Sequence, residues 1–152
     1  MIINCGEKHK GRSVEMVIIK DPQYVKWVLE TTNVSGPLLS VREEMIRLLN
    51  VFDGKVLTKK CQGLDCNNVA TGASVYKDNP NPMWWCNECD PYEHGALPGR
   101  LQIIETYVDA LNHVRNYCKG RKSDYRDLIR SIAMAKGLGK RVGQEQAQEF
   151  FR

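Results

Sequence analysis

The first third of the chain consists of apolar runs separated by short polar segments. The runs MIINC and SVEMVII, joined by the turn-forming segment GEKHKG, predict a β-hairpin over residues 1–20. The next segment, DPQYVKWVLETT, begins with an N-cap residue followed by proline, which predicts a helix from Asp21. Tyr24, Trp27 and Val28 share one face of that helix, so both aromatic side chains are predicted to lie in the core.

A second helix is predicted to begin at Ser40. The preceding segment SGP interrupts the chain, and Ser40 and Glu43 have the spacing of a capping box. Asp53 and Gly54 are expected to end the helix. Its predicted buried stripe consists of Val41, Met45, Leu48, Leu49 and Phe52.

The middle of the chain contains two short strand-like runs, NVATGASVYK and NPMWW, joined by the turn DNPNP. This pattern predicts a second β-hairpin. Trp84 and Trp85 alternate across the second strand, so one is expected in the core, and the other is a candidate for exposure and base stacking.

Helical periodicity dominates the last third of the chain. A helix is predicted over residues 101–118, with His113 on its polar side, and Ser123 is expected to cap the next helix, 124–136. The segment GLGKRVG interrupts the pattern, and residues 144–151 predict a final short helix. The apolar face of the first of these helices is formed by Leu101, Ile104, Val108, Leu111 and Val114.

The apolar content argues for an intracellular protein that does not enter a membrane. The 152 residues contain no apolar run of 18 residues, and the N-terminus lacks the apolar core of a signal peptide. Thiols stay reduced inside most cells, so paired cysteines indicate metal ligands before disulfides.

Four cysteines have the spacing of a metal site. Cys61 and Cys66 form one pair and Cys86 and Cys89 the other, with the predicted hairpin between the pairs. Two pairs of thiolates suit a tetrahedral zinc ion, as in a zinc ribbon or treble clef. Two disulfides, four unconnected buried cysteines and an iron–sulfur cluster are the alternatives.

The metal is expected to be structural. Four thiolates complete the coordination shell, whereas a catalytic zinc keeps one position open. No His or Glu lies between Cys61 and Cys86 to act as a base, and His94, just outside the pairs, is at most a competing ligand. We therefore predict no catalytic residue.

These elements predict an α+β protein: a small N-terminal β-hairpin plus helices, a central zinc-bound β-hairpin module, and C-terminal helices. The predicted segments are residues 1–54, 55–98 and 99–152.

Basic residues concentrate in the C-terminal third. Residues 1–99 carry 11 basic and 12 acidic side chains, whereas residues 100–152 carry 11 basic and 6 acidic ones. Such an excess attracts a polyanion such as nucleic acid, although charge runs also serve only to solvate a surface. The predicted phosphate contacts are Lys119, Arg121, Lys122, Arg126, Arg130, Lys140 and Arg141, with Lys8, Lys10 and Arg12 as a second patch.

The N-terminal segment CGEKHKGRSVEMVIIKDPQYVKWVLE resembles the small C-terminal domain of exodeoxyribonuclease X-like proteins. That family has a glycine- and lysine-containing hairpin, a hydrophobic strand, and then Asp-Pro-x-Tyr-x-x-Trp-x-Leu. The matching positions are Gly6, Lys10, Gly11, Asp21, Pro22, Tyr24, Trp27 and Leu29. The resemblance covers about residues 1–50 and implies an accessory domain of the kind associated with nucleases and DNA-processing proteins; it does not imply nuclease activity.

The function predicted from these features is a non-catalytic, zinc-containing, nucleic-acid-binding accessory protein of a DNA- or RNA-processing complex. One alternative is a protein–protein adaptor, such as those of viruses or mobile elements, that modulates a larger partner enzyme. A second alternative is a metal-dependent nuclease whose site has no recognisable motif.

Overall fold

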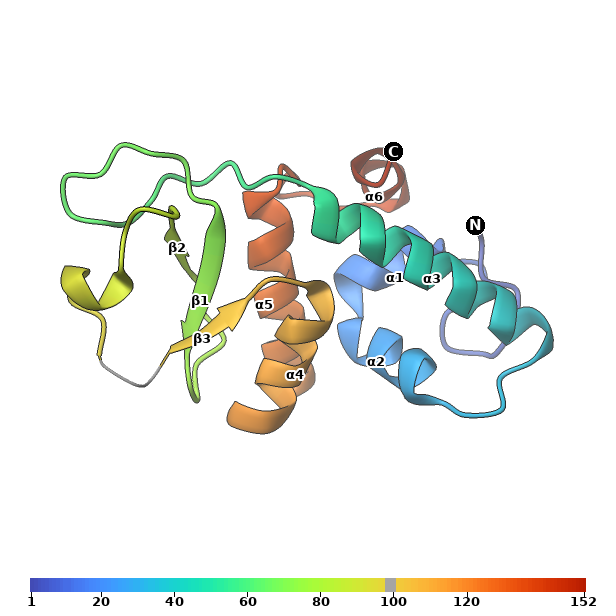
Figure 1. The fold of residues 1–152 in the computed structure, drawn as a ribbon. Helices are drawn as coiled ribbons and strands as arrows, with labels where there is room; N and C mark the ends of the chain where they lie inside the picture. The colour runs from blue at the N-terminus through green and yellow to red at the C-terminus, as the bar shows by residue number, and fades with distance from the viewer. Residues whose placement is uncertain (98–100) are drawn as a thin grey trace.

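The computed structural model describes residues 1–97 and 101–152 and confirms the α+β class (Figure 1). Its elements, in chain order, are α1 (Val14–Lys20), α2 (Pro22–Glu30), α3 (Gly36–Gly54), β1 (Gly72–Tyr76), β2 (Met83–Trp85), the 3-10 helix η1 (Pro91–His94), β3 (Leu101–Ile104), α4 (Tyr107–Tyr117), α5 (Lys122–Ala135) and α6 (Gln144–Phe150).

The three strands form an antiparallel sheet in the order β2-β1-β3. Gly72 pairs with Trp85 on one side, and Ala73 pairs with Ile104 on the other. The predicted hairpin of β1 and β2 is therefore confirmed. Figure 1 shows the sheet on one side of α4 and α5, and α1, α2 and α3 on the other.

The prediction of a second strand in the N-terminal hairpin is wrong, because α1 occupies that segment. Ser13 caps the helix by accepting a hydrogen bond from the backbone N–H of Met16 at 3.2 Å, and a single bridge between Ile2 and Ser13 is the antiparallel pairing found there. The helix is buried on most of its surface, so its residues are apolar without a clear period. A short apolar run of this kind cannot be distinguished from a strand by periodicity.

The helix predicted from Asp21 is confirmed as α2. The Asp21 carboxylate accepts a hydrogen bond from the backbone N–H of Tyr24 at 3.2 Å. Tyr24 packs partly against the core, but Trp27 is 52% exposed, so its predicted place in the core is wrong. The buried stripe of α2 runs through Val25 and Val28 and leaves Trp27 on its flank.

Helix α3 begins four residues before the predicted start. Ser35 is its N-cap and Pro37 lies in its first turn, where proline is favoured, so Ser40 is inside the helix and does not cap it. The predicted end at Gly54 is confirmed. All five residues of the predicted stripe are buried, namely Val41, Met45, Leu48, Leu49 and Phe52.

The segment predicted as one helix over residues 101–118 contains β3 followed by α4. Thr106 and Asp109 form a capping box, which fixes the start of the helix at Tyr107. His113 is buried instead of polar-facing, and its Nε2 lies 2.8 Å from the carbonyl oxygen of Asn79. Burial lowers the pKa of His113, although this hydrogen bond partly opposes the effect.

The last two helices agree with the predictions from the sequence except at one N-cap. Helix α5 begins at Lys122, so Ser123 lies in its first turn and is not the N-cap; the Asp124 carboxylate accepts the backbone N–H of Arg121 at 3.2 Å. Helix α6 confirms the predicted final short helix.

One cluster of buried apolar side chains includes residues from α1, β1 and α5, such as Val17, Val75 and Leu128. The predicted boundary at 98–99 lies outside the described residues, so the division into three segments stays a prediction. Among the described helices, none combines the length and the apolar character needed to cross a bilayer.

Tyr107 connects α4 to the α1–α2 junction. Its ring is fully buried, and its hydroxyl donates a hydrogen bond to the carbonyl oxygen of Ile18 at 2.7 Å. In a continuous helix that carbonyl would accept from the N–H of residue 22, but Pro22 has none. Tyr107 therefore satisfies a backbone group that the sequence leaves without its helical partner.

Replacing Tyr107 with Phe is expected to lower the free energy of unfolding by about 1–3 kcal/mol, because the Ile18 carbonyl would lose its buried partner. Urea denaturation followed by circular dichroism measures the change. Tyr92→Phe is the control, since Tyr92 is exposed, and it should change stability little. Equal stabilities for the two variants would show that Tyr107 has no such role.

Candidate metal centre and basic face

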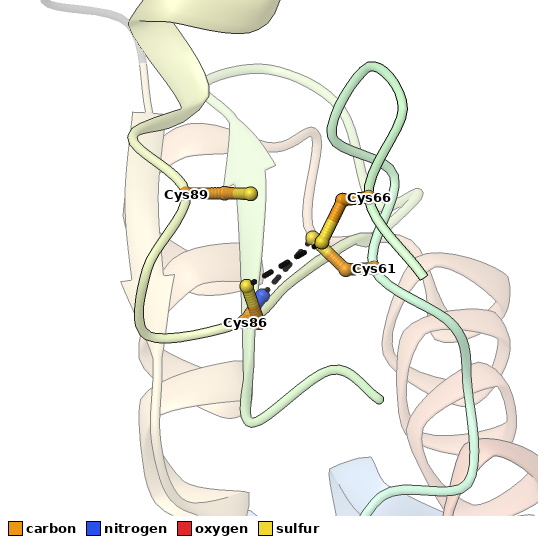
Figure 2. A group of neighbouring side chains, drawn as sticks. All are labelled: Cys61, Cys66, Cys86 and Cys89. Carbon is orange, nitrogen blue, oxygen red and sulfur yellow. Dashed lines mark hydrogen bonds between the residues drawn. The ribbon is translucent and has the colours of Figure 1, made fainter. Parts of the chain in front are cut away.

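The four predicted ligand cysteines come together at one end of the sheet. Cys61 and Cys66 lie on the segment that precedes β1, and Cys86 and Cys89 follow β2 directly. Pairing of β1 with β2 brings the two segments side by side, and Figure 2 shows the two pairs of side chains facing each other.

The distances between the sulfur atoms suit a metal ion. All four lie within 4.8 Å of one another, and the Sγ atoms of Cys66 and Cys86 are 3.8 Å apart (Figure 2). For zinc–sulfur bonds of about 2.3 Å, the edge of a tetrahedron of sulfurs is about 3.8 Å. The four cysteines are free thiols. The cluster could therefore hold a metal ion such as zinc.

Backbone and side-chain donors surround the sulfurs. The Sγ of Cys61 accepts hydrogen bonds from the backbone N–H groups of Cys86 at 3.2 Å and Gly63 at 3.4 Å. The Sγ of Cys86 accepts one from the side-chain amide of Asn68 at 3.7 Å. These donors favour the thiolate form, which is the form that binds metals.

The four thiols cannot all ionise easily without a cation. A hydrogen bond from the backbone of Glu88 is the main cause that lowers the pKa of Cys86 to about 6. A hydrogen bond with Cys86 is the main cause that raises the pKa of Cys89, because a Cys89 thiolate would lose this bond and be repelled by the Cys86 thiolate. A divalent cation would remove that repulsion.

His94 supports the cysteine loop and lies outside the group of ligand atoms. Its Nδ1 accepts a hydrogen bond at 2.7 Å from the backbone N–H of Leu64, which lies between Cys61 and Cys66. The interaction ties η1 to the loop that presents the first pair of sulfurs.

Neither tryptophan of β2 is exposed, so the prediction that one of the two is exposed is wrong. Trp84 is 7% exposed and packs in the main core, whereas Trp85 is 8% exposed and packs against the cysteines. The indole N–H of Trp85 donates to the hydroxyl of Ser74 at 2.8 Å. Each face of the strand is covered, and no stacking surface is left at this position.

The structure brings the two predicted basic patches together. A hollow of about 240 Å³, here the N-terminal hollow, is lined by Lys8, Arg12, Lys20 and Lys122. A second hollow of about 480 Å³ along α5 shares Lys20 and Lys122 with the first. The basic face is defined as the seven basic residues of both hollows: Lys8, Arg12, Lys20, Lys122, Arg126, Arg130 and Lys140.

Two acidic residues, Asp21 and Asp127, line the same hollows. The face therefore has an excess of five positive charges, more than the net charge of +4 for the whole chain. Lys20 was not predicted, because its segment looked like a strand that ends before a helix cap. Its position between the patches follows only from the packing of α1 against α5.

Four other predicted basic residues do not line either hollow. Arg121 forms an ion pair with Asp124 at 3.5 Å, and Arg141 lines a different hollow that also contains Glu145. Lys10 and Lys119 are exposed in loops. As phosphate contacts, these four remain predictions from the sequence.

Asp21 is the buried anion of the N-terminal hollow. Burial alone would raise its pKa, but hydrogen bonds from Lys8, His9 and the backbone of Tyr24 outweigh that effect, so the pKa lies below its usual value. His9 is buried beside it, with Nε2 at 2.8 Å from the carboxylate. The carboxylate stays charged at neutral pH and holds the surrounding cations.

Comparisons with protein-family models, curated proteins and solved structures gave no match for this chain.

Gly63→Ala is expected to weaken metal binding. A Cβ at this position would lie 2.7 Å from the Sγ of Cys89 and 3.3 Å from the Cβ of Cys66, so the two ligands would have to shift. Zinc affinity, measured by competition with a chromogenic chelator, should fall by about tenfold or more.

Gly72→Ala is the matched control in the same module, because an added Cβ there meets no atom within 4 Å. Its zinc affinity should equal that of the unmodified protein. If Gly63→Ala binds zinc as tightly as Gly72→Ala does, the four cysteines do not close on one ion in the arrangement described.

Proposed function

We propose that this protein is a non-catalytic nucleic-acid-binding accessory protein with a structural zinc ion. The observation that carries the proposal is the basic face, where two patches far apart in the sequence become one cationic surface. Phosphates of a nucleic acid would replace the counterions of this surface, which favours binding at low salt.

The arrangement of the basic face supports a backbone-tracking role. Its seven side chains follow α5 from Lys122 to Arg130 and continue over α1 to the N-terminal loop. Arg130 also donates a hydrogen bond at 2.8 Å to the carbonyl oxygen of Lys140, which fixes the loop after α5 against the helix. Contacts of this kind position a nucleic acid without reading its sequence.

Zinc is the metal we propose for the cysteine cluster. Four thiolates in a tetrahedral arrangement suit zinc, and the absence of an open position makes the ion structural. In that role, Cys61, Cys66, Cys86 and Cys89 would hold the two loops together, and metal binding would contribute directly to the folding free energy.

The accessory role in a DNA- or RNA-processing complex rests on the resemblance of residues 1–50 to the exodeoxyribonuclease X-like C-terminal domain. Two of the matching residues have defined places here: Asp21 caps α2, and Pro22 begins it. Both serve the local structure that carries the N-terminal hollow.

A protein–protein adaptor is the second candidate. It is favoured by an apolar hollow of about 620 Å³ beside the sheet, lined in part by the exposed side chains of Val56, Val69 and Ile103. Contiguous exposed apolar side chains are typical of protein contacts. If the purified protein binds neither DNA nor RNA at low salt, this candidate replaces the first.

Replacing Lys20 and Arg126 together with Gln is expected to weaken nucleic-acid binding and its dependence on salt. For a duplex, each lost phosphate contact lowers the slope of log K against log salt concentration by about 0.9, so the slope should fall by about two. Fluorescence anisotropy of a labelled duplex over a salt series measures both quantities.

The control carries the same loss of charge elsewhere: Lys59→Gln with Lys60→Gln, two exposed residues that line neither hollow of the basic face. It should keep the slope of the unmodified protein. Equal slopes for both double variants would argue against the basic face as the binding surface.

Cys86→Ser is expected to release zinc and to unpair β1 from β2, because one of four ligands and the acceptor of the Asn68 amide are altered. Metal analysis and hydrogen exchange at the backbone amides of Gln62 and Thr71, which bond to β2, measure the two effects. Cys118→Ser, outside the cluster, should retain zinc. Full zinc content in Cys86→Ser would contradict the proposed centre.

A further inference from the structure

The exposed indole of Trp27 is a feature that the basic face alone does not explain. Trp27 is 52% exposed, whereas the two other tryptophans are below 10%. Helix α2 buries its stripe through Val25 and Val28, so the helix does not need Trp27 for its packing. A large aromatic ring left half in water is the kind of surface on which a ligand ring can stack.

Two rings, those of Tyr24 and His9, connect Trp27 to the N-terminal hollow. His9, which lines the hollow, contacts Tyr24 edge-on with ring centroids 4.6 Å apart. Tyr24 contacts Trp27 at 5.7 Å with an angle of 33° between the ring planes. The hydrogen bond between His9 and Asp21 holds the buried end of this series in place. Tyr24, which contacts the indole directly, therefore packs against a fixed ring.

The charges near Trp27 do not oppose a phosphate chain. The acidic residue on the same helix, Glu30, forms ion pairs with Lys26 at 3.0 Å and Arg115 at 2.9 Å. The other nearby carboxylate, Asp21, is buried and bonded to Lys8 and His9. Both carboxylates are therefore already paired with cations and leave no free negative charge on α2 or at its N-cap.

We propose that the preferred ligand of this protein is a single-stranded nucleic acid, with one phosphate in the N-terminal hollow and an adjacent base stacked on Trp27. This inference rests on the proposed function. In a duplex, each base is covered on both faces by its neighbours, so an exposed indole has no base to accept. A single strand can turn one base onto Trp27 while its backbone follows the basic face.

Stacking is tolerant of sequence because every base has an aromatic face, so both DNA and RNA single strands carry the required chemistry. The hollow supplies the phosphate contact through Lys8, Arg12, Lys20 and Lys122. The 2′-hydroxyl distinguishes RNA from DNA, so binding is tested with both oligo-dT and oligo-U of equal length.

The test compares Trp27→Ala, Trp27→Phe and the unmodified protein against labelled single strands and a duplex of the same length. Trp27→Ala should lose about tenfold or more in affinity for the single strand, the contribution of one stacked base, and keep its affinity for the duplex. Trp27→Phe should retain most of the single-strand affinity, because its ring can still stack. Tyr92→Ala, another exposed aromatic residue, is the control and should bind as the unmodified protein does.

Fluorescence gives an independent readout. Because Trp84 and Trp85 are buried, quenching of emission by an added oligonucleotide would come from Trp27. Trp27→Phe should bind the single strand without that quenching. Thermal denaturation of the variants verifies that each is folded before binding is compared.

The outcomes separate this inference from the proposed function. The stacking proposal is overturned if Trp27→Ala binds the single strand as tightly as the unmodified protein does. It is also overturned if the variant loses affinity equally for the single strand and the duplex. In either case the basic face remains the proposed binding surface. No binding of any nucleic acid at low salt, by a folded protein, overturns both. Dependence on Trp27 with either oligo-dT or oligo-U supports the proposal and identifies the sugar that is accepted.

Discussion

The carboxylate of Asp21 joins parts of the chain that are distant in sequence. One oxygen caps α2 through the backbone N–H of Tyr24, and the other lies 2.8 Å from His9, 3.0 Å from Lys8 and 3.9 Å from Lys122. Cations from the N-terminal loop and from α5 would repel one another without this anion between them. Within the N-terminal hollow, the buried negative charge of Asp21 therefore offsets the repulsion between Lys8 and Lys122.

The strand β2 connects the metal cluster to the rest of the protein. Its two tryptophans alternate across the strand, so Trp84 packs in the main core and Trp85 packs on the cysteines. A second connection comes from Thr58, whose backbone N–H and hydroxyl both donate to the carbonyl oxygen of Ala135 at the end of α5. The segment that carries the cysteine cluster is thus connected to α5 by hydrogen bonds and to the main core by packing of β2.

The sequence was sufficient where local chemistry determines the structure. The N-cap at Asp21, the buried stripe of α3 and the spacing of the four cysteines each depend on residues close together in the chain. It was insufficient where tertiary packing decides. The buried helix α1 resembles a strand because neighbours cover most of its surface, and the exposure of Trp27 follows from which stripe of α2 meets the core. The union of the two basic patches likewise depends on the packing of α1 against α5.

The metal cluster and the basic face are formed by different elements of the fold. Figure 1 shows β2 beyond α5 on one side and α1 and α2 on the other. A metal held by four cysteines would have no open position for a phosphate oxygen, and the cations of the basic face are on separate elements. The ion would therefore act on the proposed nucleic-acid binding only through the fold, by fixing the sheet whose strand β3 packs against α4. This separation favours a structural metal over a catalytic one, because metal-assisted cleavage requires the ion to contact the scissile phosphate.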